Sequence, residues 1–399
     1  MTTTLDLKDL QLNALLEVTQ AINNNLPEED LLKIYKFTLL ADLKIQKLAL
    51  FTDLEGDWTC RVHFGTAESC EGVSLNPEFL DLKEVEKIET SDQFEGQFQQ
   101  VFPVYHKEKL LAVVFISTGE ESAVENRFLN ALTNLILVAI ENKKFSRKQL
   151  EQEAYERELE IAKKVQNFLF PKQLPMAERL QIEAFYLPHK DVGGDYYDYI
   201  PIDKNRFLIC IADVSGKGVP AALLMSNFQA SLRTLVRHSL NLEEVIHELN
   251  LTTYRSGNAE NFITFFAAIY DYTTKELEYI NCGHNEIVLI NNDEIVLLNE
   301  GTTILGMFDP LPFIKTEVIR DLTDFFIFAY TDGLTETFSE EDEAFEFERL
   351  EELIKNQLGN LQGLHNKILD ELVEFKGSRK FHDDITMLSC RVLNDDSAL

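Results

Sequence analysis

Apolar and polar residues alternate at two different spacings in the first third of the chain. Where apolar side chains recur every three to four positions the pattern predicts a helix, and where they alternate or run together over a short stretch it predicts a strand. Helices are expected at 10–25, 28–43 and 126–145, and strands at 47–53, 59–65, 99–106 and 109–117. The order helix, strands, helix predicts an α+β module that ends near Lys144.

From Glu141 to about Phe170 the sequence becomes strongly charged but keeps an apolar seam. The seam residues lie three to five positions apart: Leu150, Ala154, Leu159, Ala162, Val165 and Leu169. This spacing and the alternating charges beside it predict a helix, which Pro171 and Pro175 end. Two interpretations stay open, a solvated connector and a dimeric stalk that carries a signal.

The run RFLICIAD, residues 206–213, is almost continuously apolar up to a final aspartate, which predicts a buried strand with Asp213 at its end. The following residues, VSGKGVPAALLM, lack the spacing of a phosphate-binding loop, because Lys217 lies between two glycines and Val219 stands where a hydroxyl is required. Asp213 is therefore either a helix cap or a metal ligand. Taken alone, the cap is favoured.

Further aspartates share the context of Asp213. Asp195 follows two glycines in DVGGDYYDYI, Asp332 lies at a strand end before a glycine in AYTDGL, and Asp383 and Asp384 precede the strand in DDITMLSC. A glycine beside a strand end lets the backbone turn sharply, so that a carboxylate can stand clear of the sheet. In a chain without clustered Cys or His ligands, this set predicts a carboxylate cage for hard divalent cations, Mg²⁺ or Mn²⁺.

The composition narrows the classes of function. The chain has 399 residues, enough for two or three domains, and its formal net charge of −31 argues against binding to nucleic acid or to anionic lipid. Its five cysteines lack paired metal-ligand spacing, which favours free thiols in a reducing compartment. The N-terminus lacks a signal segment, and no apolar run approaches the roughly 18 residues of a membrane helix. These features predict a cytoplasmic protein without membrane spans.

Residues 1–144 resemble a GAF domain in the helix pair at the start, the strand pair VFPVYHKEKLLAVVFIS near the end and the long closing helix. The resemblance implies a sensor that forms dimers and binds an unknown small ligand or partner. Cys60 and His63 are the residues to consider as cofactor anchors. A surface or core role is favoured for both, because a single Cys or His without partners makes no metal site.

Five motifs between Leu159 and Val392 resemble, in the same order, those of the PPM-type metal-dependent Ser/Thr phosphatases, and specifically their SpoIIE-like or RsbU-like bacterial branch. They are VGGDYYD, ADVSGKGVPAALLMS, NCGHNEIVLI, YTDGLTET and DDITML, preceded by ELEIAKKVQNFLFPKQLP. The resemblance implies an αββα sandwich. The expected division is a GAF-like sensor domain at 1–144, a helical, coiled-coil-like linker at 145–172, a phosphatase domain at 173–394 and a tail at 395–399.

Carried over residue by residue, the resemblance makes Asp195 and Asp213 the central metal ligands. Asp213 is then the bridging ligand, and the Val214 carbonyl is a further ligand. Asp332 and Asp383 complete the site. The motifs contain two further acids. Asp384 is a further candidate metal ligand, although only one side chain of the pair Asp383 and Asp384 is expected to point inward. Asp198 is expected to face elsewhere.

The residues that position phosphate and protonate the leaving group stay open. Unlike eukaryotic members of the wider family, the chain has no evident arginine beside the first aspartate and no histidine after the DV aspartate. Lys217 is a candidate phosphate contact, although an ordinary surface lysine is favoured. His284 is a candidate general acid, although a glycine-flanked histidine that secures a hairpin by hydrogen bonds is favoured.

Two divalent ions about 3.5 to 4 Å apart can activate a bridging water for in-line attack on phosphorus. The expected function is therefore a signal-regulated Mn²⁺- or Mg²⁺-dependent protein serine/threonine phosphatase that holds two ions. The resemblance further implies a phosphorylated STAS-type anti-anti-sigma factor or similar regulator as substrate, and a homodimer through the GAF domain and linker helix. The alternative is a catalytically silent scaffold with the PPM fold, but the four acidic positions favour the enzyme.

Overall fold

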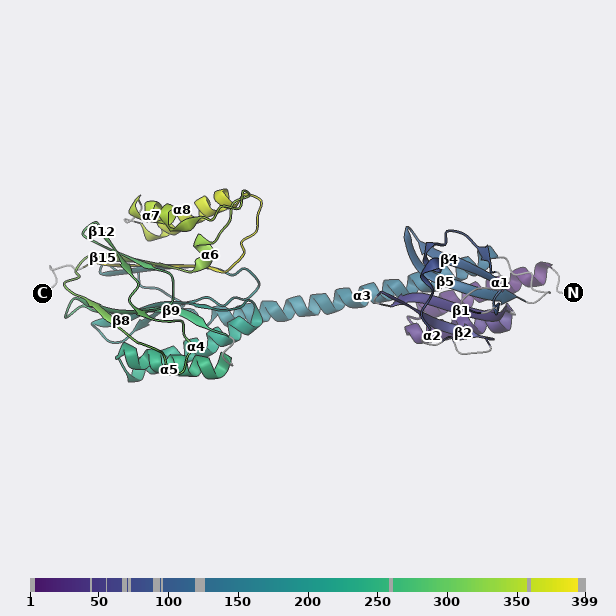
Figure 1. Ribbon diagram of the computed structural model, residues 1–399, viewed down its shortest axis with the longest axis horizontal. Helices are drawn as coiled ribbons and strands as arrows, with labels where there is room; N and C mark the ends of the chain where they lie inside the picture. Colours follow the sequence, from purple (N-terminus) through teal and green to yellow (C-terminus); the bar gives the residue numbers. More distant parts are fainter. Residues whose placement is uncertain are drawn as a thin grey trace. The chain divides into compact units, whose positions relative to one another are not determined.

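The structure is a computed structural model that describes residues 4–43, 45–54, 56–66, 70, 73–88, 94, 96–118, 126–257, 261–356 and 360–393. The chain divides into two compact units, Met1–Ala154 and Tyr155–Leu399, and each is described by itself (Figure 1). The predicted domain bounds at 144 and 172 stay predictions, and the predicted tail at 395–399 lies outside the described residues.

The long helix α3 (Asn126–Asn167) joins the two helical patterns that the sequence predicted at 126–145 and 141–170. No glycine or proline interrupts it. Ion pairs one turn apart support its charged part, with 2.8 Å between Arg147 Nε and Glu151 Oε1 and 2.9 Å between Lys164 Nζ and Glu160 Oε1.

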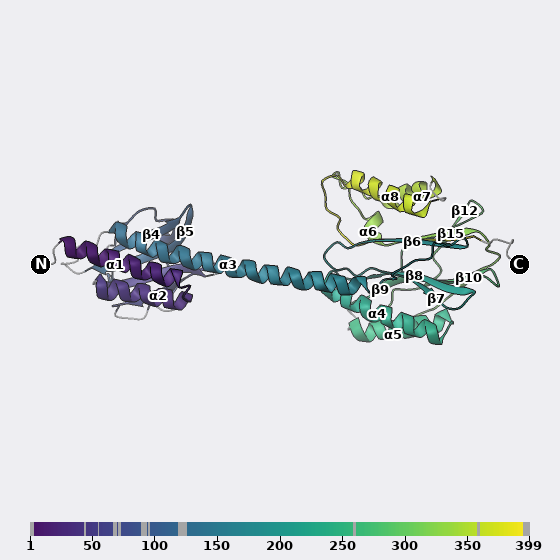
Figure 2. The ribbon, with the colours of Figure 1, turned by 180° about the vertical axis from the view of Figure 1, so that it is seen from behind.

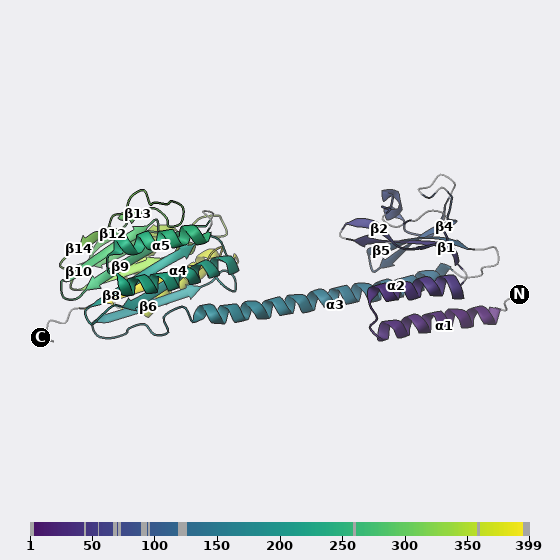
Figure 3. The ribbon, with the colours of Figure 1, turned by 90° about the horizontal axis from the view of Figure 1, so that it is seen from below.

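The first unit is an antiparallel sheet with helices on one face (Figure 3). The strands pair in the order β2-β1-β5-β4-β3. The strands are β1 (Ile45–Leu54), β2 (Asp57–Phe64), β3 (Glu86–Lys87), β4 (Gln100–His106) and β5 (Lys109–Thr118), and the helices besides α3 are α1 (Thr4–Asn23) and α2 (Glu28–Phe37). The strands and helices predicted for this unit are therefore confirmed in type and place.

Strand β1 explains how this sheet is buried on both faces. Leu48 and Leu50 pack with the helices, whereas Ala49 and Phe51 pack with aromatic side chains on the opposite face. This follows from the two-residue period of a strand.

The second unit contains two mainly antiparallel sheets, with the strand orders β13-β10-β9-β8-β7, in which β14 also pairs with β10, and β12-β11-β15-β16-β6. The strands are β6 (Leu180–Leu187), β7 (Tyr196–Pro201), β8 (Arg206–Val214), β9 (Ile263–Asp271), β10 (Glu276–Cys282), β11 (Ile287–Asn291), β12 (Glu294–Leu298), β13 (Gly301–Thr302), β14 (Glu317–Ile319), β15 (Phe325–Tyr330) and β16 (Ile385–Val392). The helices are α4 (Val219–His238), α5 (Leu242–Gly257), α6 (Asp332–Thr335), α7 (Glu346–Asn356) and α8 (Leu361–Lys376).

Helices cover the outer faces of these two sheets, as Figures 1 and 2 show. Strand β8 presents Ile209 and Ile211 to the core between the sheets, and Leu208 and Cys210 to the core beneath α4 and α5. A third core joins β15 and β16 to α7 and α8. Because β8 is buried on both faces, its sequence is a nearly continuous apolar run.

Across the residues that the structure describes, no helix has both the length and the apolar character needed to cross a bilayer.

Candidate active site

Asp213 lies near the C-terminal end of β8, an inner strand of its sheet. Asp213 is opposite Thr264 in the register with β9, and Val214 is the last residue of the strand. The turn that follows contains Gly216 and Gly218 at positive φ, a conformation that favours glycine. Gly218 is the N-cap of α4, and no side chain caps this helix. The interpretation of Asp213 as a helix cap is therefore wrong.

Asp195 lies immediately before β7 and is almost completely buried. Two hydroxyl groups donate hydrogen bonds to its Oδ2 atom, Thr331 Oγ1 at 2.8 Å and Thr386 Oγ1 at 2.5 Å. Thr331 follows β15 and Thr386 belongs to β16, so the second sheet orients a carboxylate that the first sheet supplies.

Two glycines before Asp195 allow the chain segments to approach closely. A Cβ atom on Gly193 would lie 2.0 Å from Asp384 Oδ2, and one on Gly194 would lie 2.7 Å from the Val214 carbonyl oxygen. The Gly194 amide also donates to Asp384 Oδ2 at 2.7 Å. Glycine is therefore required sterically at these two positions.

Asp332 and the pair Asp383 and Asp384 complete the cluster from the second sheet. Asp332 is the first residue of α6, one residue beyond the N-cap Thr331 that follows β15. Asp384 is buried and also accepts a hydrogen bond from the His189 amide at 2.7 Å, whereas Asp383 is partly exposed and lies 2.6 Å from Lys217 Nζ. Both acids of the pair therefore lie at the cluster, although only one was expected to point inward.

The protonation of these carboxylates reflects their proximity. Burial, followed by the charges of Asp332 and Asp383, raises the pKa of Asp213 to about 7. Burial and nearby carboxylates, Asp383 among them, raise the pKa of Asp332 to about 6. Burial and the charges of Asp213 and Asp384 raise the pKa of Asp195 well above its usual range. A carboxylate is disfavoured by burial and by like charges, so these acids gain from a bound cation.

The donor chemistry of the cluster fits a hard divalent cation. It consists of carboxylate oxygens with the Val214 carbonyl oxygen close by, and such ligands suit Mg²⁺ or Mn²⁺ rather than softer metals. The described cysteines are buried and carry no disulfide. Within the described ranges, no three His, Cys, Asp and Glu side chains already stand where they could hold one ion.

Asp198 is separate from this cluster. It is fully buried and accepts two hydrogen bonds from Arg233, at 2.6 Å from Nε to Oδ2 and 2.9 Å from Nη2 to Oδ1. The Tyr196 hydroxyl and the Tyr199 amide donate to it as well. Asp198 thus joins β7 to α4 through an ion pair in which only the carboxylate is fully buried, and it faces away from the acidic cluster, as expected.

His284 is a structural residue. Its Nε2 atom donates to the Tyr330 carbonyl at 3.1 Å, since a carbonyl oxygen can only accept, and its Nδ1 atom then accepts from Thr264 Oγ1 at 2.7 Å. Burial lowers the pKa of His284 to about 4, so the ring is neutral at pH 7. A neutral ring with both nitrogens engaged is unsuited to act as a general acid.

Four residues that hold the acids of these motifs or their segments in place were not found from the sequence: Thr331, Thr386, Arg233, and Gln166, whose side chain bonds the backbone of Gly193. Thr331 and Thr386 stand within the motifs YTDGLTET and DDITML, beside the metal acids. Their place next to strand-end aspartates is a signal that could have identified them. Arg233 and Gln166 lie on helices, and no local pattern distinguishes them from other polar helix residues.

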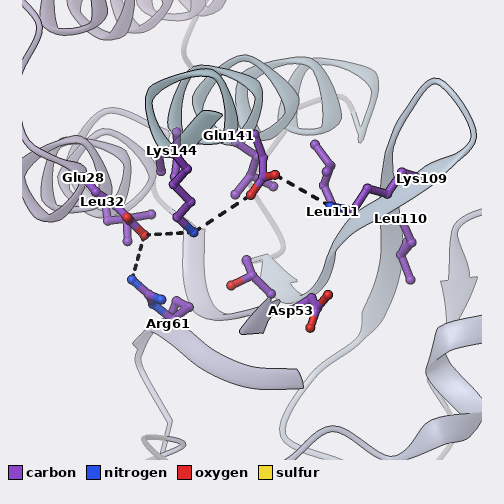
Figure 4. Close-up of a pocket in the computed structure, with 12 residues that line it drawn as sticks. Glu28, Leu32, Asp53, Arg61, Lys109, Leu110, Leu111, Glu141 and Lys144 are labelled. Carbon is purple, nitrogen blue, oxygen red and sulfur yellow. Dashed lines mark hydrogen bonds and ion pairs between the residues drawn. The ribbon is translucent and has the colours of Figure 1, made fainter. Parts of the chain in front are cut away.

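The first unit contains a separate, small charged hollow of about 40 Å³ (Figure 4). Arg61 Nη2 lies 2.7 Å from Glu28 Oε1, and Lys144 Nζ lies 3.7 Å from Glu28 and 3.9 Å from Glu141. Lys109 also pairs with Glu141, at 3.7 Å. The charges of the acidic and basic side chains at this hollow thus balance each other through these ion pairs.

Neither of the two residues considered as cofactor anchors lines that hollow. Cys60 is buried in the aromatic core of the first unit, and its thiol donates to the Val62 carbonyl with 3.7 Å between sulfur and oxygen. His63 is partly buried on the same strand.

Comparison with known proteins places the second unit in a family. Residues 203–393 match the family model "Stage II sporulation protein E (SpoIIE)". The chain is 29% identical over 243 residues to phosphoserine phosphatase RsbU of Bacillus subtilis, covering 60% of this chain and 71% of RsbU. It is 26% identical over 244 residues to phosphoserine phosphatase RsbP of the same organism, covering 60% of this chain and 58% of RsbP.

A solved structure supports the fold assignment. The SiaA-PP2C domain of Pseudomonas aeruginosa superimposes with a TM-score of 0.51 at 19% sequence identity, covering 60% of this chain and 98% of that domain. The likeness concerns the fold alone. The family match and the two named phosphatases confirm the family indicated by the five motifs: residues 203–393 are a SpoIIE-type PPM phosphatase domain, homologous to RsbU and RsbP.

Proposed function

We propose that this chain is a metal-dependent protein serine/threonine phosphatase that acts on a phosphorylated regulatory protein. The observation that carries the proposal is the convergence of four acids at or beside strand ends, Asp195, Asp213, Asp332 and Asp383. The last three lie within the range that matches the SpoIIE family. The layers of helices and sheets around them are proposed to be the αββα sandwich of PPM phosphatases.

The proposed cofactors are two Mn²⁺ or Mg²⁺ ions. Asp195, Asp213, Asp332 and Asp383 would hold them, with Asp384 and the Val214 carbonyl as further ligands. When bound, such ions lower the pKa of a water molecule and neutralise charge on the phosphoryl group. Asp213 is proposed as the bridging ligand because it lies between the other acids. The charges of Asp332 and Asp383 raise the pKa of its carboxyl, and a hydrogen bond links the same carboxyl to Asp195.

The other residues of the site orient and neutralise these ligands. Thr331 and Thr386 fix the plane of the Asp195 carboxylate by donating to one of its oxygens. Lys217 forms an ion pair with Asp383, and its Nζ atom also donates to the His382 carbonyl at 2.5 Å. It is therefore a partner of the acidic cluster in addition to a candidate phosphate contact.

The proposed substrate is phosphoserine or phosphothreonine on a STAS-type anti-anti-sigma factor or a similar small regulator. The support is the similarity to RsbU and RsbP, which are named phosphoserine phosphatases. The test is release of phosphate from a phosphorylated STAS protein, with Mn²⁺ and with EDTA, by the wild type and by Asp213→Asn. Hydrolysis that needs Mn²⁺ and Asp213 supports the enzyme. If the wild type binds the phosphoprotein but releases no phosphate from it or from p-nitrophenyl phosphate, the chain is a silent scaffold.

The first unit is proposed to be a GAF-like sensor that regulates this phosphatase in a cytoplasmic homodimer. Its helices α1, α2 and α3 cover one face of the sheet, and apolar side chains of the α3 seam such as Leu150 and Val165 are exposed. Exposed apolar residues at helical spacing are typical of a surface that pairs. Light scattering of the full chain tests the dimer, and ligand-induced thermal shifts of the full chain test the sensor. A monomer at micromolar concentration would contradict the dimer.

A further inference from the structure

The side chain of Gln166 forms a two-point contact with the segment that carries Asp195. Its Nε2 atom donates to the Gly193 carbonyl at 2.7 Å, and its Oε1 atom accepts from the Gly193 amide at 3.3 Å. Gln166 is 5% exposed and belongs to the last turn of α3. One side-chain amide thus pairs with both backbone groups of a single residue.

Gly193 is a sensitive point for the metal acids. Its α-carbon packs so closely on Asp384 that a Cβ atom would clash with Oδ2, and the next amide, of Gly194, donates to the same carboxylate oxygen. Asp195 follows directly. A displacement of Gly193 would therefore move Asp195 and remove the hydrogen bond that fixes Asp384.

The end of α3 is itself held firmly. Phe170 is buried, with its ring centroid 4.9 Å from that of Tyr186 and 5.0 Å from that of Tyr197. Leu169 packs against the core beneath α4 and α5. Gln166 therefore projects from a fixed base, which a residue that positions another segment requires.

We infer that Gln166 is a positioning residue of the phosphatase site, which holds Gly193 and Gly194 so that Asp195 and Asp384 stand correctly for metal. The inference rests on the proposed function for its metal. The physical reason is that buried backbone groups need partners, and a pair of bonds in opposite directions fixes both position and orientation. Loss of a partner that orients a metal ligand typically costs 10- to 100-fold in metal affinity or activity.

The test compares Gln166→Leu and Gln166→Glu with a matched control, Gln229→Leu. Leucine removes both hydrogen bonds at nearly the same volume, whereas glutamate keeps the acceptor and keeps a donor only when its carboxyl is protonated. Gln229 is similarly buried, at 7% exposure, and its side chain contacts the same end of α3 through the Leu169 carbonyl rather than through Gly193. A general loosening of the fold would affect all three variants, whereas loss of positioning would affect only the Gln166 variants.

The first measurement is amide hydrogen exchange of the metal-free full chain. We expect exchange of the Gly193 and Gly194 amides to accelerate about tenfold or more in Gln166→Leu, less in Gln166→Glu, and within about twofold of wild type in Gln229→Leu. Unchanged exchange in Gln166→Leu, or equal acceleration in the control, overturns the inference. If Gln166→Leu does not fold, Gln166→Glu decides by the same criterion.

The second measurement is Mn²⁺ affinity by calorimetry. We expect binding about 10- to 100-fold weaker in Gln166→Leu, with the control within about twofold of wild type. If Gln166→Leu shows faster exchange at Gly193 and Gly194 but binds Mn²⁺ as tightly as wild type, the claim that Gln166 positions the metal ligands is overturned. A wild-type chain that binds no Mn²⁺ refutes the proposed metal-dependent function instead, and the exchange measurement then still decides whether Gln166 holds the segment.

Discussion

The Nζ atom of Lys217 lies 2.6 Å from Asp383 Oδ2, so the lysine of the SGKG turn is an ion-pair partner of the acidic cluster. Both side chains are partly exposed, and an exposed pair of this kind contributes only about 0 to 1 kcal/mol to stability. We therefore expect the Lys217–Asp383 ion pair to affect the activity of the site more than the stability of the fold.

Lys217→Ala should lower phosphatase activity less than Asp213→Asn does. A point charge near phosphate is partly replaced by the metal ions, whereas a ligand is not. We expect a loss of about tenfold in kcat/KM for p-nitrophenyl phosphate in saturating Mn²⁺, with the unfolding midpoint unchanged. Damage as large as that of Asp213→Asn would make Lys217 a primary phosphate ligand.

Asp213→Asn and Asp332→Asn should each abolish metal-dependent activity while the fold persists. The loss should exceed the roughly 10- to 100-fold that removal of an outer partner costs. Removing one carboxylate also relieves repulsion in the metal-free cluster, so the free energy of unfolding in EDTA should stay constant or rise. Kinetics with Mn²⁺ and urea denaturation in EDTA check both parts. Activity within a few-fold of wild type in both variants would rule out the metal cage.

The metal-free protein should lose stability as the pH rises from about 4 to about 7. The pKa of Asp213 is raised to about 7 and that of Asp332 to about 6, against roughly 4 for an unfolded aspartate. In this window the folded state holds protons that the unfolded chain has released, so the free energy of unfolding falls with increasing pH.

We therefore expect the thermal midpoint in EDTA to decrease between pH 5 and pH 7.5, and to decrease less in Asp213→Asn. Protons also compete with metal, so Mn²⁺ should bind more tightly at pH 7.5 than at pH 5.5. The difference in pH dependence between wild type and Asp213→Asn reports the contribution of the acidic cluster, because the other titrating groups are the same in both proteins. The same slope in both proteins would contradict the assignment.

Arg233→Met should destabilise the fold without removing a metal ligand. It leaves the fully buried Asp198 carboxylate without its cationic partner, whose own side chain is 38% exposed. Because solvent screens this pair in part, we expect a cost of about 1 to 3 kcal/mol. Urea denaturation should show this loss, and the double variant Arg233→Met/Asp198→Leu should recover part of it. A cost below about 1 kcal/mol would mean that Asp198 is satisfied by Tyr196 and Tyr199 alone.

The strand ends of the site could be predicted because burial on both faces leaves a continuous apolar run in the sequence. The run before Asp213 and the run before Asp332 both become strands, β8 and β15. The contacts between these ends could not be predicted in the same way. Thr331 and Thr386 meet Asp195 across 136 and 191 residues, and this pairing depends on how two sheets stack.

The helix cap that the stretch around Asp213 favours when taken alone is wrong for a local reason. An aspartate shortly before a helix favours the N-cap, but the turn before α4 is long enough to place Gly218 there instead. The two-point contact of Gln166 has no local signal either. In the stretch VQNFLF, a glutamine that becomes buried cannot be distinguished from a polar residue on the solvent side of the helix. The acids of the site therefore leave a signal in the sequence, whereas Gln166, which holds their segment in place, does not.

The last prediction concerns regulation through α3. In the last turn of this helix Val165 is 57% exposed while its neighbour Gln166 is buried against Gly193. One turn thus presents an apolar side chain to the surface and a positioning side chain to the metal site. A helix is stiff over this length, so a change in how the exposed seam is packed can reach Gly193 as a rotation or shift of Gln166.

Leu159→Asp and Val165→Asp should therefore change phosphatase activity although neither residue is a metal ligand. Each puts a charge into the seam that the proposed dimer would cover. We expect activity to change at least about threefold in the full chain, with loss of the dimer by light scattering. Lys163→Asp, on the same exposed turn but outside the seam, is the matched control and should leave both properties unchanged. If α3 is only a connector, both seam variants keep wild-type activity, and residues 155–399, which retain Gln166, are as active in saturating Mn²⁺ as the full chain.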